Sequence, residues 1–325
     1  MSGLRVAQGV AWALTVQALL LLGVVLLQSS PVSPSVVVIS TRTEWAGLVA
    51  NRINTTPGHP VRAFVGTTTG EALDDLRADR TQGVLLVDPS RAADELTVSS
   101  VQGTDAAATV SAVVGSAVRA EGRQLASADL TEFAVGDPGG RHAHQLLLAW
   151  IISGLVLGAL TTGARRPGLA RELLACALLG ALGALLSAMS VGIVCLVVAS
   201  WTQDAAPMFL IGVIVVWASA LLARAASVGA RGVALLAVSA ALLVVAANPI
   251  ATGADGFGRA GPIWAPIGPL TLPGAAMSAL RRVAYVDRPV SAAQWATLAW
   301  WCAVGVLAAV LANSGWTGER SDNAR

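Results

Sequence analysis

The segment NPIATGADGFGRAGPIWAPIGPLTLPGAAMSALRRVAYVD, residues 248–287, decides how the rest of the chain can fold. It is apolar enough to contact a membrane, yet its five prolines and repeated glycines exclude one continuous helix. Irregular backbone in a bilayer needs protein or water to satisfy its N–H and C=O groups. We therefore predict a re-entrant or interfacial cover over a helix bundle, with helical character returning over residues 274–285.

The composition of the whole chain is that of a membrane protein. Of its 325 residues, 55% are hydrophobic and 12% charged, whereas about 25% charged residues is usual in soluble domains. The net charge of +2 gives no reason to expect a nucleic-acid partner. The chain contains no lysine, so it cannot form a Walker A phosphate loop, which needs that residue. We expect no enzymatic activity and no cofactor or metal; any ATPase is a separate protein.

Six apolar runs are candidates for transmembrane helices, since about 20 residues span the hydrocarbon core. The first run is interpreted as an uncleaved anchor, because a signal peptide normally has an apolar region of only about 7–15 residues. The six runs are residues 7–28, 146–162, 173–200, 207–222, 233–248 and 292–314.

The loops between these runs alternate in arginine content. Loop 161–172 carries three arginines and loop 223–232 carries two, whereas loop 201–206 carries none. Positively charged loops stay cytoplasmic. The pattern predicts a plasma-membrane protein, in the inner membrane of a bacterium, with both termini cytoplasmic and residues 29–143 and 249–291 outside.

The expected fold class is a polytopic α-helical membrane protein of six transmembrane helices, with an extracytoplasmic α/β domain between the first and the second. The expected parts are an N-terminal anchor (1–28), the α/β domain (29–143), four transmembrane helices (144–248), the Pro/Gly-rich loop (249–291), the last transmembrane helix (292–315) and a cytoplasmic tail (316–325).

Strand and helix patterns alternate in the polar part of the chain, which predicts a partly parallel sheet with right-handed crossovers. Thr68 and Glu71 form a capping box for one helix, and Asp105 is placed to cap another. We find no nucleophile elbow, Gly-rich phosphate loop or carboxylate pair at catalytic spacing. The expected strands are 37–39, 61–65, 83–87 and 96–101, and the expected helices are 43–53, 68–76 and 105–121.

The predicted spans hold no ionisable residue away from their ends. Ion-coupled transporters usually keep such residues in mid-membrane, so a self-powered secondary transporter is disfavoured. Small residues instead recur at close-packing spacing, at Gly154, Gly158, Gly180 and Gly183. These glycines pack helices either within one chain or between two copies.

Several short motifs follow one another in a distinctive order along the chain. They are Val37–Ile39 with residues 45–51, Glu71-Ala-Leu-Asp-Asp-Leu, Gly83-Val-Leu-Leu-Val, Leu96-Thr-Val-Ser-Ser, Asn248-Pro-Ile-Ala-Thr-Gly, Leu272-Pro-Gly-Ala-Ala and Leu280-Arg-Arg-Val-Ala-Tyr. With the order of anchor, outer domain, five spans and outer loop, the chain resembles the permease subunits of type-2 ABC exporters, in the phage-infection-protein-like branch.

That resemblance implies an export subunit for a hydrophobic or amphipathic substrate, working as a homodimer or heterodimer with a separate nucleotide-binding ATPase. Arg165, Arg166, Arg171 and Glu172 would form the cytoplasmic loop that docks this ATPase. A basic loop that merely obeys the topology rule is the competing interpretation.

Trp264, Arg281, Arg282 and Tyr285 are the candidate contacts at the outer mouth, either with the substrate or with lipid head groups of the bilayer. A different class of function stays open: a non-transporting membrane scaffold whose outer domain binds a cell-envelope component. A membrane-embedded enzyme has little support, because no outer carboxylate has a visible catalytic partner.

Overall fold

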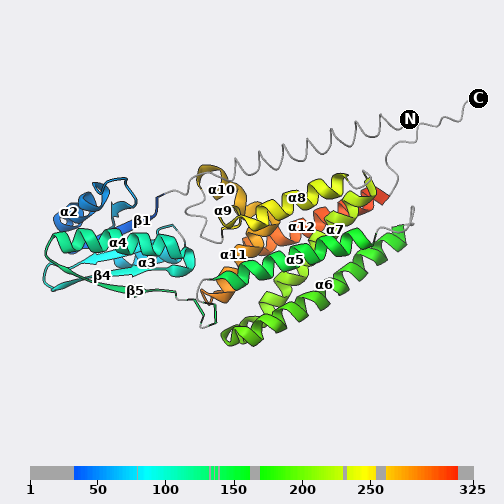
Figure 1. The fold of residues 1–325 in the computed structure, drawn as a ribbon, viewed down its shortest axis with the longest axis horizontal. Coiled ribbons are helices and arrows are strands. Elements are labelled where there is room, and N and C mark those ends of the chain that lie inside the picture. Colours follow the sequence, from blue (N-terminus) through cyan, green and yellow to red (C-terminus); the bar gives the residue numbers. More distant parts are fainter. Residues whose placement is uncertain are drawn as a thin grey trace, which may run out of the picture.

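The computed structural model describes residues 33–78, 80–131, 133–134, 136–137, 140–161, 169–229, 233–253 and 261–313. These residues form two lobes, an α/β unit (residues 33–131) and a helical bundle (residues 140–313), which lie end to end (Figure 1). The predicted anchor and cytoplasmic tail lie outside the described residues, as do Arg165 and Arg166.

The α/β unit is built on a five-stranded mixed sheet in the order β2-β1-β3-β4-β5. The β2, β1 and β3 strands are parallel, β4 is antiparallel to β3, and β5 is parallel to β4. This confirms the expected partly parallel sheet. The strands are β1 (Ser35–Ser40), β2 (Arg62–Val65), β3 (Gly83–Val87), β4 (Ala93–Val98) and β5 (Gln124–Asp129).

Helices cover both faces of this sheet. The α2 helix (Thr43–Asn54) and the α4 helix (Thr104–Ala120) share a core with Val36 and Val38 of β1. The α3 helix (Thr69–Arg77) packs on the opposite face, against Ile39. Side chains alternate across a strand, so neighbouring residues of β1 serve both cores.

Most elements of the α/β unit agree with the sequence patterns, and Thr68 caps α3 by accepting a hydrogen bond from Glu71 N. Three details of the prediction were wrong. The β5 strand was missed, β4 begins three residues before the expected strand, and Asp105 makes no capping bond because Gly103 is the N-cap of α4.

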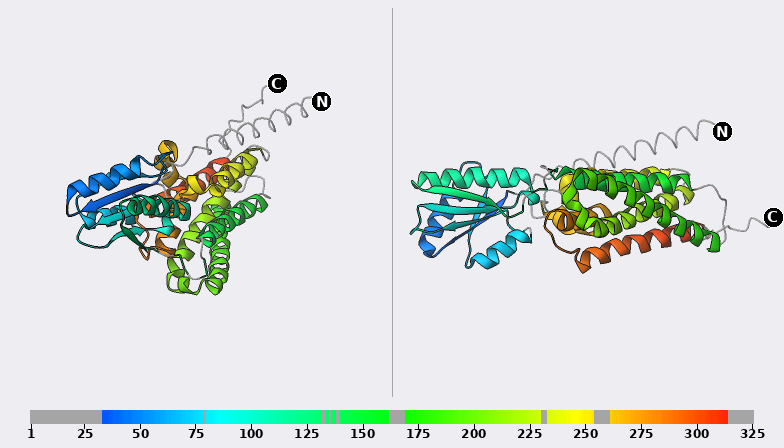
Figure 2. Two further views of the ribbon diagram at one scale, coloured as in Figure 1. Left: turned by 60° about the vertical axis from the view of Figure 1, so that its left-hand side comes forward. Right: turned by 90° about the horizontal axis from the view of Figure 1, so that it is seen from below.

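The bundle contains four helices that, among the described residues, are long and apolar enough to cross a membrane: Arg141–Leu160, Leu169–Val197, Ala199–Ser227 and Ala292–Ala312. They correspond to α5 (Arg141–Leu160), α6 (Leu169–Val197), η2 (Ala199–Asp204) with α7 (Ala205–Gly229), and α12 (Ala292–Asn313). The α7 helix is central, since it packs against α5, α6 and α12 (Figure 2).

The fifth apolar run forms a helix at the expected residues, but this helix is short for a membrane span. The α8 helix (Val233–Ala247) has 15 residues, which is fewer than the roughly 20 that cross the hydrocarbon core. It ends just before Asn248 and Pro249, which begin the Pro/Gly-rich segment. Four helices of the described part of the chain therefore remain as membrane-crossing candidates.

The Pro/Gly-rich segment is broken into short pieces, as its prolines predicted. The pieces are α9 (Pro249–Thr252), α10 (Gly261–Ile267), η4 (Gly268–Leu270) and α11 (Leu272–Ala284). Thr271 starts α11 by accepting a hydrogen bond from Gly274 N. Helix α11 is largely buried and packs against α5, α7, α8 and α12, so the segment is a plug at one end of the bundle.

The four predicted packing glycines all face α7. A Cβ at Gly154 would lie 2.5 Å from the carbonyl oxygen of Val216, and one at Gly158 would lie still closer to the carbonyl oxygen of Ala220. Gly180 and Gly183 face Trp217 and Val216 at ordinary contact distances. At these positions the described helices pack within one chain.

This difference in spacing gives a prediction. Gly158→Ala is expected to destabilise the bundle by about 1–3 kcal/mol, because the added methyl overlaps backbone that cannot move aside. Gly180→Ala is the matched control, expected to cause no loss, since its Cβ would meet Trp217 at 3.5 Å and alanine favours helix. SDS titration of the purified protein measures both; equal loss in the two variants would contradict the assignment.

Candidate functional site

The junction between the two lobes is organised around the carboxylate of Asp137, which is buried. It accepts hydrogen bonds from the backbone N–H groups of Arg141 (2.9 Å) and His142 (3.3 Å), at the start of α5. His142 Nδ1 lies 2.8 Å from the same carboxylate. Asp137 therefore satisfies N–H groups that the first turn of a helix leaves unpaired, although Gly140 occupies the N-cap position.

Tyr285 connects α11 to this carboxylate. Its hydroxyl donates to Asp137 Oδ2 at 2.6 Å, and its ring packs edge-on against Phe133 and Trp201. Burial is the main cause that raises the pKa of Tyr285 well above its usual value, and the hydrogen bond to Asp137 raises it further. The hydroxyl thus stays protonated and remains a donor at physiological pH.

Arg281, one turn before Tyr285, joins the α/β unit to the bundle directly. Its guanidinium donates to the carbonyl oxygen of Val101, which follows β4, and to that of Gly253, which follows α9. The residue is 9% exposed. A planar guanidinium with several donors suits such bridging, so the two lobes are fixed to one another by α11.

The other end of the bundle holds a buried ion pair. Glu172, in the first turn of α6, receives two hydrogen bonds from Arg224 of α7, with both N–O distances 2.7 Å. The side chains are 6% and 2% exposed for Arg224 and Glu172. Arg224 also donates to the carbonyl oxygen of Thr161, where α5 ends. Three helices are thereby tied together at this end.

These positions correct several sequence-based expectations. Glu172 is buried within α6, so it does not belong to an exposed docking loop; its neighbour Arg171 is exposed. Arg281 and Tyr285 are buried structural contacts and not free groups at an outer mouth. The prediction treated these residues as loop or surface positions, because their partners lie far away in the sequence.

The remaining two candidates lie nearer the surface. Arg282 is half-exposed and donates from Nε to the carbonyl oxygen of Pro289 at 3.2 Å. Trp264 of α10 is half-buried, and its indole nitrogen is enclosed with no hydrogen-bond partner among the described residues. Of the four outer-mouth candidates, only Arg282 therefore keeps a charged group partly accessible.

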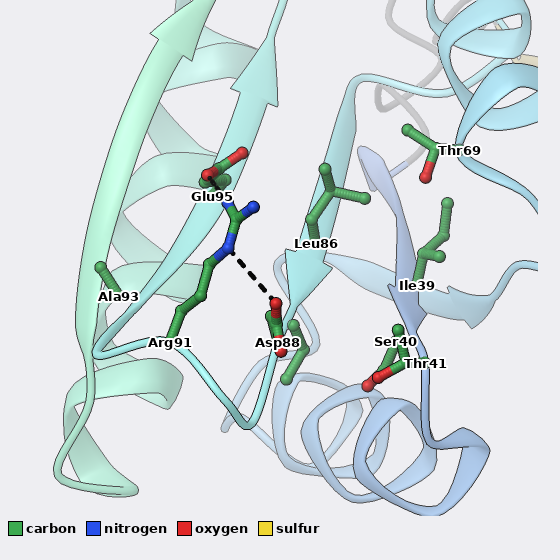
Figure 3. Close-up of a pocket in the computed structure, with 10 residues that line it drawn as sticks. Ile39, Ser40, Thr41, Thr69, Leu86, Asp88, Arg91, Ala93 and Glu95 are labelled. Atoms are coloured by element: carbon green, nitrogen blue, oxygen red, sulfur yellow. Dashed lines mark hydrogen bonds and ion pairs between the residues drawn. The ribbon is translucent and has the colours of Figure 1, made fainter.

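A pocket of about 240 Å³ lies at the opposite end of the α/β unit (Figure 3). Ile39 and Leu86 form an apolar part of its wall, and Asp88, Arg91 and Glu95 contribute charged groups. It lies just beyond the carboxyl ends of β1 and β3. In the left view of Figure 2 the β1 arrow points away from the bundle, so the pocket faces away from the junction.

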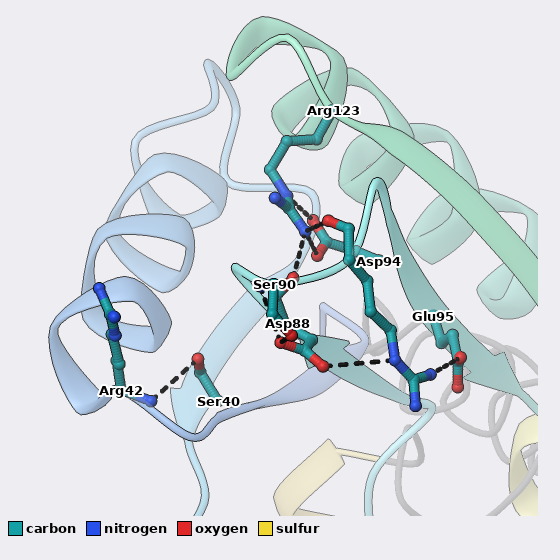
Figure 4. A network of polar contacts seen from close by, with 8 residues as sticks. Ser40, Arg42, Asp88, Ser90, Asp94, Glu95 and Arg123 are labelled. Atoms are coloured by element: carbon teal, nitrogen blue, oxygen red, sulfur yellow. Dashed lines mark hydrogen bonds and ion pairs between the residues drawn. The ribbon is translucent and has the colours of Figure 1, made fainter.

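A network of polar contacts holds the loop beside this pocket in place (Figure 4). Arg123 pairs with the buried carboxylate of Asp94, at 2.6 Å for the closer contact, and donates to the carbonyl oxygens of Asp88 and Arg91. The hydrogen bonds that Arg123 donates to Asp94 raise the pKa of Arg123. One side chain thus fixes both ends of the turn between β3 and β4.

No protein-family model, curated protein or solved structure matches this chain.

Proposed function

We propose that this chain is a permease-like subunit of an ABC-type export system, which moves a hydrophobic or amphipathic substrate and depends on a separate ATPase. In this proposal it crosses the plasma membrane six times, with both termini in the cytoplasm and the α/β unit outside. The chain would work as a homodimer or heterodimer.

The observation that carries the proposal is the placement of the ionisable groups in the four candidate spans. His142, Glu172 and Arg224 all lie at or near helix ends and are engaged in fixed contacts. The middle of each span holds no Asp, Glu, His or Arg. Ion-coupled carriers place such groups at mid-membrane, so a chain of this kind fits an energy supply from outside itself.

The tight connection between the two lobes supports the same proposal. Arg281 fixes the α/β unit to α11 through Val101, and Asp137 fixes the connecting segment to α5 and α11. Arg224 fixes α5, α6 and α7 to one another at the far end. A movement imposed at the inner end of the helices would therefore reach the outer unit as a rigid-body displacement.

The proposed orientation predicts which positions an impermeant thiol reagent can reach in intact cells. In a background with the three cysteines replaced, Ala112→Cys on the exposed side of α4 is expected to react, whereas Ala170→Cys, exposed at the far end of α6, reacts only after permeabilisation. Labelling of Ala170→Cys in intact cells with protection of Ala112→Cys would reverse the orientation and overturn the proposal.

The dependence on an ATPase is tested by purification from the native host in mild detergent. Vanadate-sensitive ATP hydrolysis is expected to co-purify with the chain and to be lost when Arg165 and Arg166 are both changed to Glu. The matched control is Arg77→Glu with Arg80→Glu, an equal charge change on exposed residues of the α/β unit. Native protein that carries no ATPase activity would contradict the export proposal.

A second candidate, a non-transporting scaffold whose outer unit binds a cell-envelope component, is favoured by one observation. The pocket beyond β1 and β3 has both polar and apolar lining, is preformed and is remote from the bundle. This candidate needs no ATPase, so the same purification distinguishes it from export.

A further inference from the structure

The pocket of the α/β unit occupies the position where open α/β sheets bind ligands. The strands β1 and β3 are neighbours at the centre of the sheet. From β1 the chain continues to β2, towards one edge of the sheet, and from β3 it continues to β4, towards the other edge. A crevice forms outside the carboxyl ends of strands at such a reversal of direction. Ser40 and Thr41 after β1, and Asp88 and Arg91 after β3, line the pocket at this point.

The pocket offers both donors and acceptors around an apolar surface. Arg91 pairs with Asp88 at 3.3 Å and with Glu95 Oε1 at 2.6 Å, which leaves Glu95 Oε2 without a partner among the described residues. The hydroxyls of Ser40, Thr41 and Thr69 can donate or accept. Leu86, together with the small part of Ile39 that α3 leaves uncovered, adds an apolar patch beside these groups (Figure 3).

The geometry of these groups is held in advance of binding. Ser90 donates to Asp88 Oδ1 from its hydroxyl (2.6 Å) and its backbone N–H (2.9 Å), and these bonds lower the pKa of Asp88. Arg123 fixes the backbone of the same turn from below. A pocket that does not need to be ordered by its ligand loses less affinity on binding.

Charge and size narrow the class of ligand. The two carboxylates and one guanidinium sum to a net charge of −1, which disfavours phosphates and other anions. Asp88 is already engaged by Ser90 and Arg91, so the carboxylates are not arranged to hold a free cation. The volume of about 240 Å³ is below the range of roughly 300–1,000 Å³ for drug-sized ligands. A small neutral ligand remains.

We infer that this pocket binds a single neutral sugar ring, presented by a glycan at a distance from the membrane surface. The hydroxyls of a pyranose donate and accept in a ring around its edge, and its C–H face is apolar. The sugar hydroxyls complement Glu95 and the hydroxyls of the pocket, and the C–H face complements the Ile39–Leu86 patch. The inference rests on the proposed outer position of the α/β unit, but not on export or on an ATPase, because it involves only that unit.

The test uses the full chain in phosphatidylcholine nanodiscs, without glycoside detergents, and saturation-transfer NMR with glucose, galactose, mannose and N-acetylglucosamine. At least one sugar is expected to bind with a Kd of about millimolar. Ala93→Leu, which fills the pocket, and Glu95→Gln, which removes an exposed charge, are each expected to weaken binding by about tenfold. Glu121→Gln is the matched control, because Glu121 is in an exposed ion pair with Arg52 elsewhere in the same unit.

Each outcome bears on the inference. Sugar transfer that both pocket variants reduce and Glu121→Gln leaves unchanged supports it. No transfer from any of the four sugars, or equal loss in Glu121→Gln, overturns it. Binding of inorganic phosphate or methylammonium at the same residues, without sugar binding, would overturn the inference and assign the pocket to an ion. Glu95→Gln keeps the test decisive if Ala93→Leu fails to fold, and a negative result leaves the ATPase test of the export proposal intact.

Discussion

Arg224→Ala is expected to lower the free energy of unfolding by about 3–5 kcal/mol, the usual effect of removing one partner from a buried ion pair. Glu172 would be left with an uncompensated charge in an apolar environment, and the carbonyl oxygen of Thr161 would lose its donor. SDS titration of the purified protein measures the change. Arg171→Ala is the matched control, since Arg171 is exposed on the same turn as Glu172, and is expected to change stability by less than about 0.5 kcal/mol.

A second pair of variants separates an unpaired charge from a general packing defect. The double change Glu172→Leu with Arg224→Met is expected to recover much of the loss, because replacing both ions by apolar side chains is often neutral. The recovery should be incomplete, since Thr161 stays without its guanidinium donor. If the double variant loses as much free energy of unfolding as Glu172→Leu and Arg224→Met lose separately when added together, the two residues do not interact.

Asp137→Ala is expected to have a comparable effect at the other end of the bundle, about 3–5 kcal/mol. The change leaves the Tyr285 hydroxyl and the N–H groups of Arg141 and His142 without their acceptor, and each unsatisfied buried group costs about 1–3 kcal/mol. Limited proteolysis is expected to cut between the α/β unit and α5 faster in this variant, because the junction is released. The unfolding transition should also begin there.

Two variants distinguish loss of this junction from loss of charge alone. Tyr285→Phe keeps the ring between Phe133 and Trp201 but removes one charge-assisted hydrogen bond, with an expected loss of about 1.5–3 kcal/mol. Asp105→Ala removes an exposed carboxylate from the start of α4, where it caps nothing, and is expected to be nearly neutral. Equal proteolysis of Asp137→Ala and the unmodified protein would contradict the role assigned to Asp137.

The sequence allowed most of the α/β unit to be predicted, because strand and helix periodicity are local properties. The exception is instructive: β5 reads Gln-Leu-Ala-Ser-Ala-Asp and is largely exposed at the sheet edge. Small and polar residues on an edge strand give little alternation to detect. The early start of β4 was missed for a different reason, since Asp94 is buried in the sheet only because Arg123 neutralises it.

The candidate site was harder to predict because its contacts are long-range. Asp137 and Tyr285 are 148 positions apart, and Glu172 and Arg224 are 52 apart. Charged residues beside an apolar run are normally solvated, so Arg281 and Glu172 were assigned to the surface. One signal was available in the sequence. Glu172 lies at the start of one apolar run and Arg224 near the end of the next, so an antiparallel pair of helices would bring the two charges together.

The short α8 helix has a consequence for the surrounding lipid. Its 15 residues extend about 22 Å at 1.5 Å per residue, whereas the hydrocarbon core is about 30 Å thick. A crossing by α8 would require the adjacent leaflets to thin by roughly 8 Å, and such hydrophobic mismatch costs a fraction of a kcal/mol for each ångström. Acyl chains beside α8 would be compressed and less ordered than elsewhere around the protein.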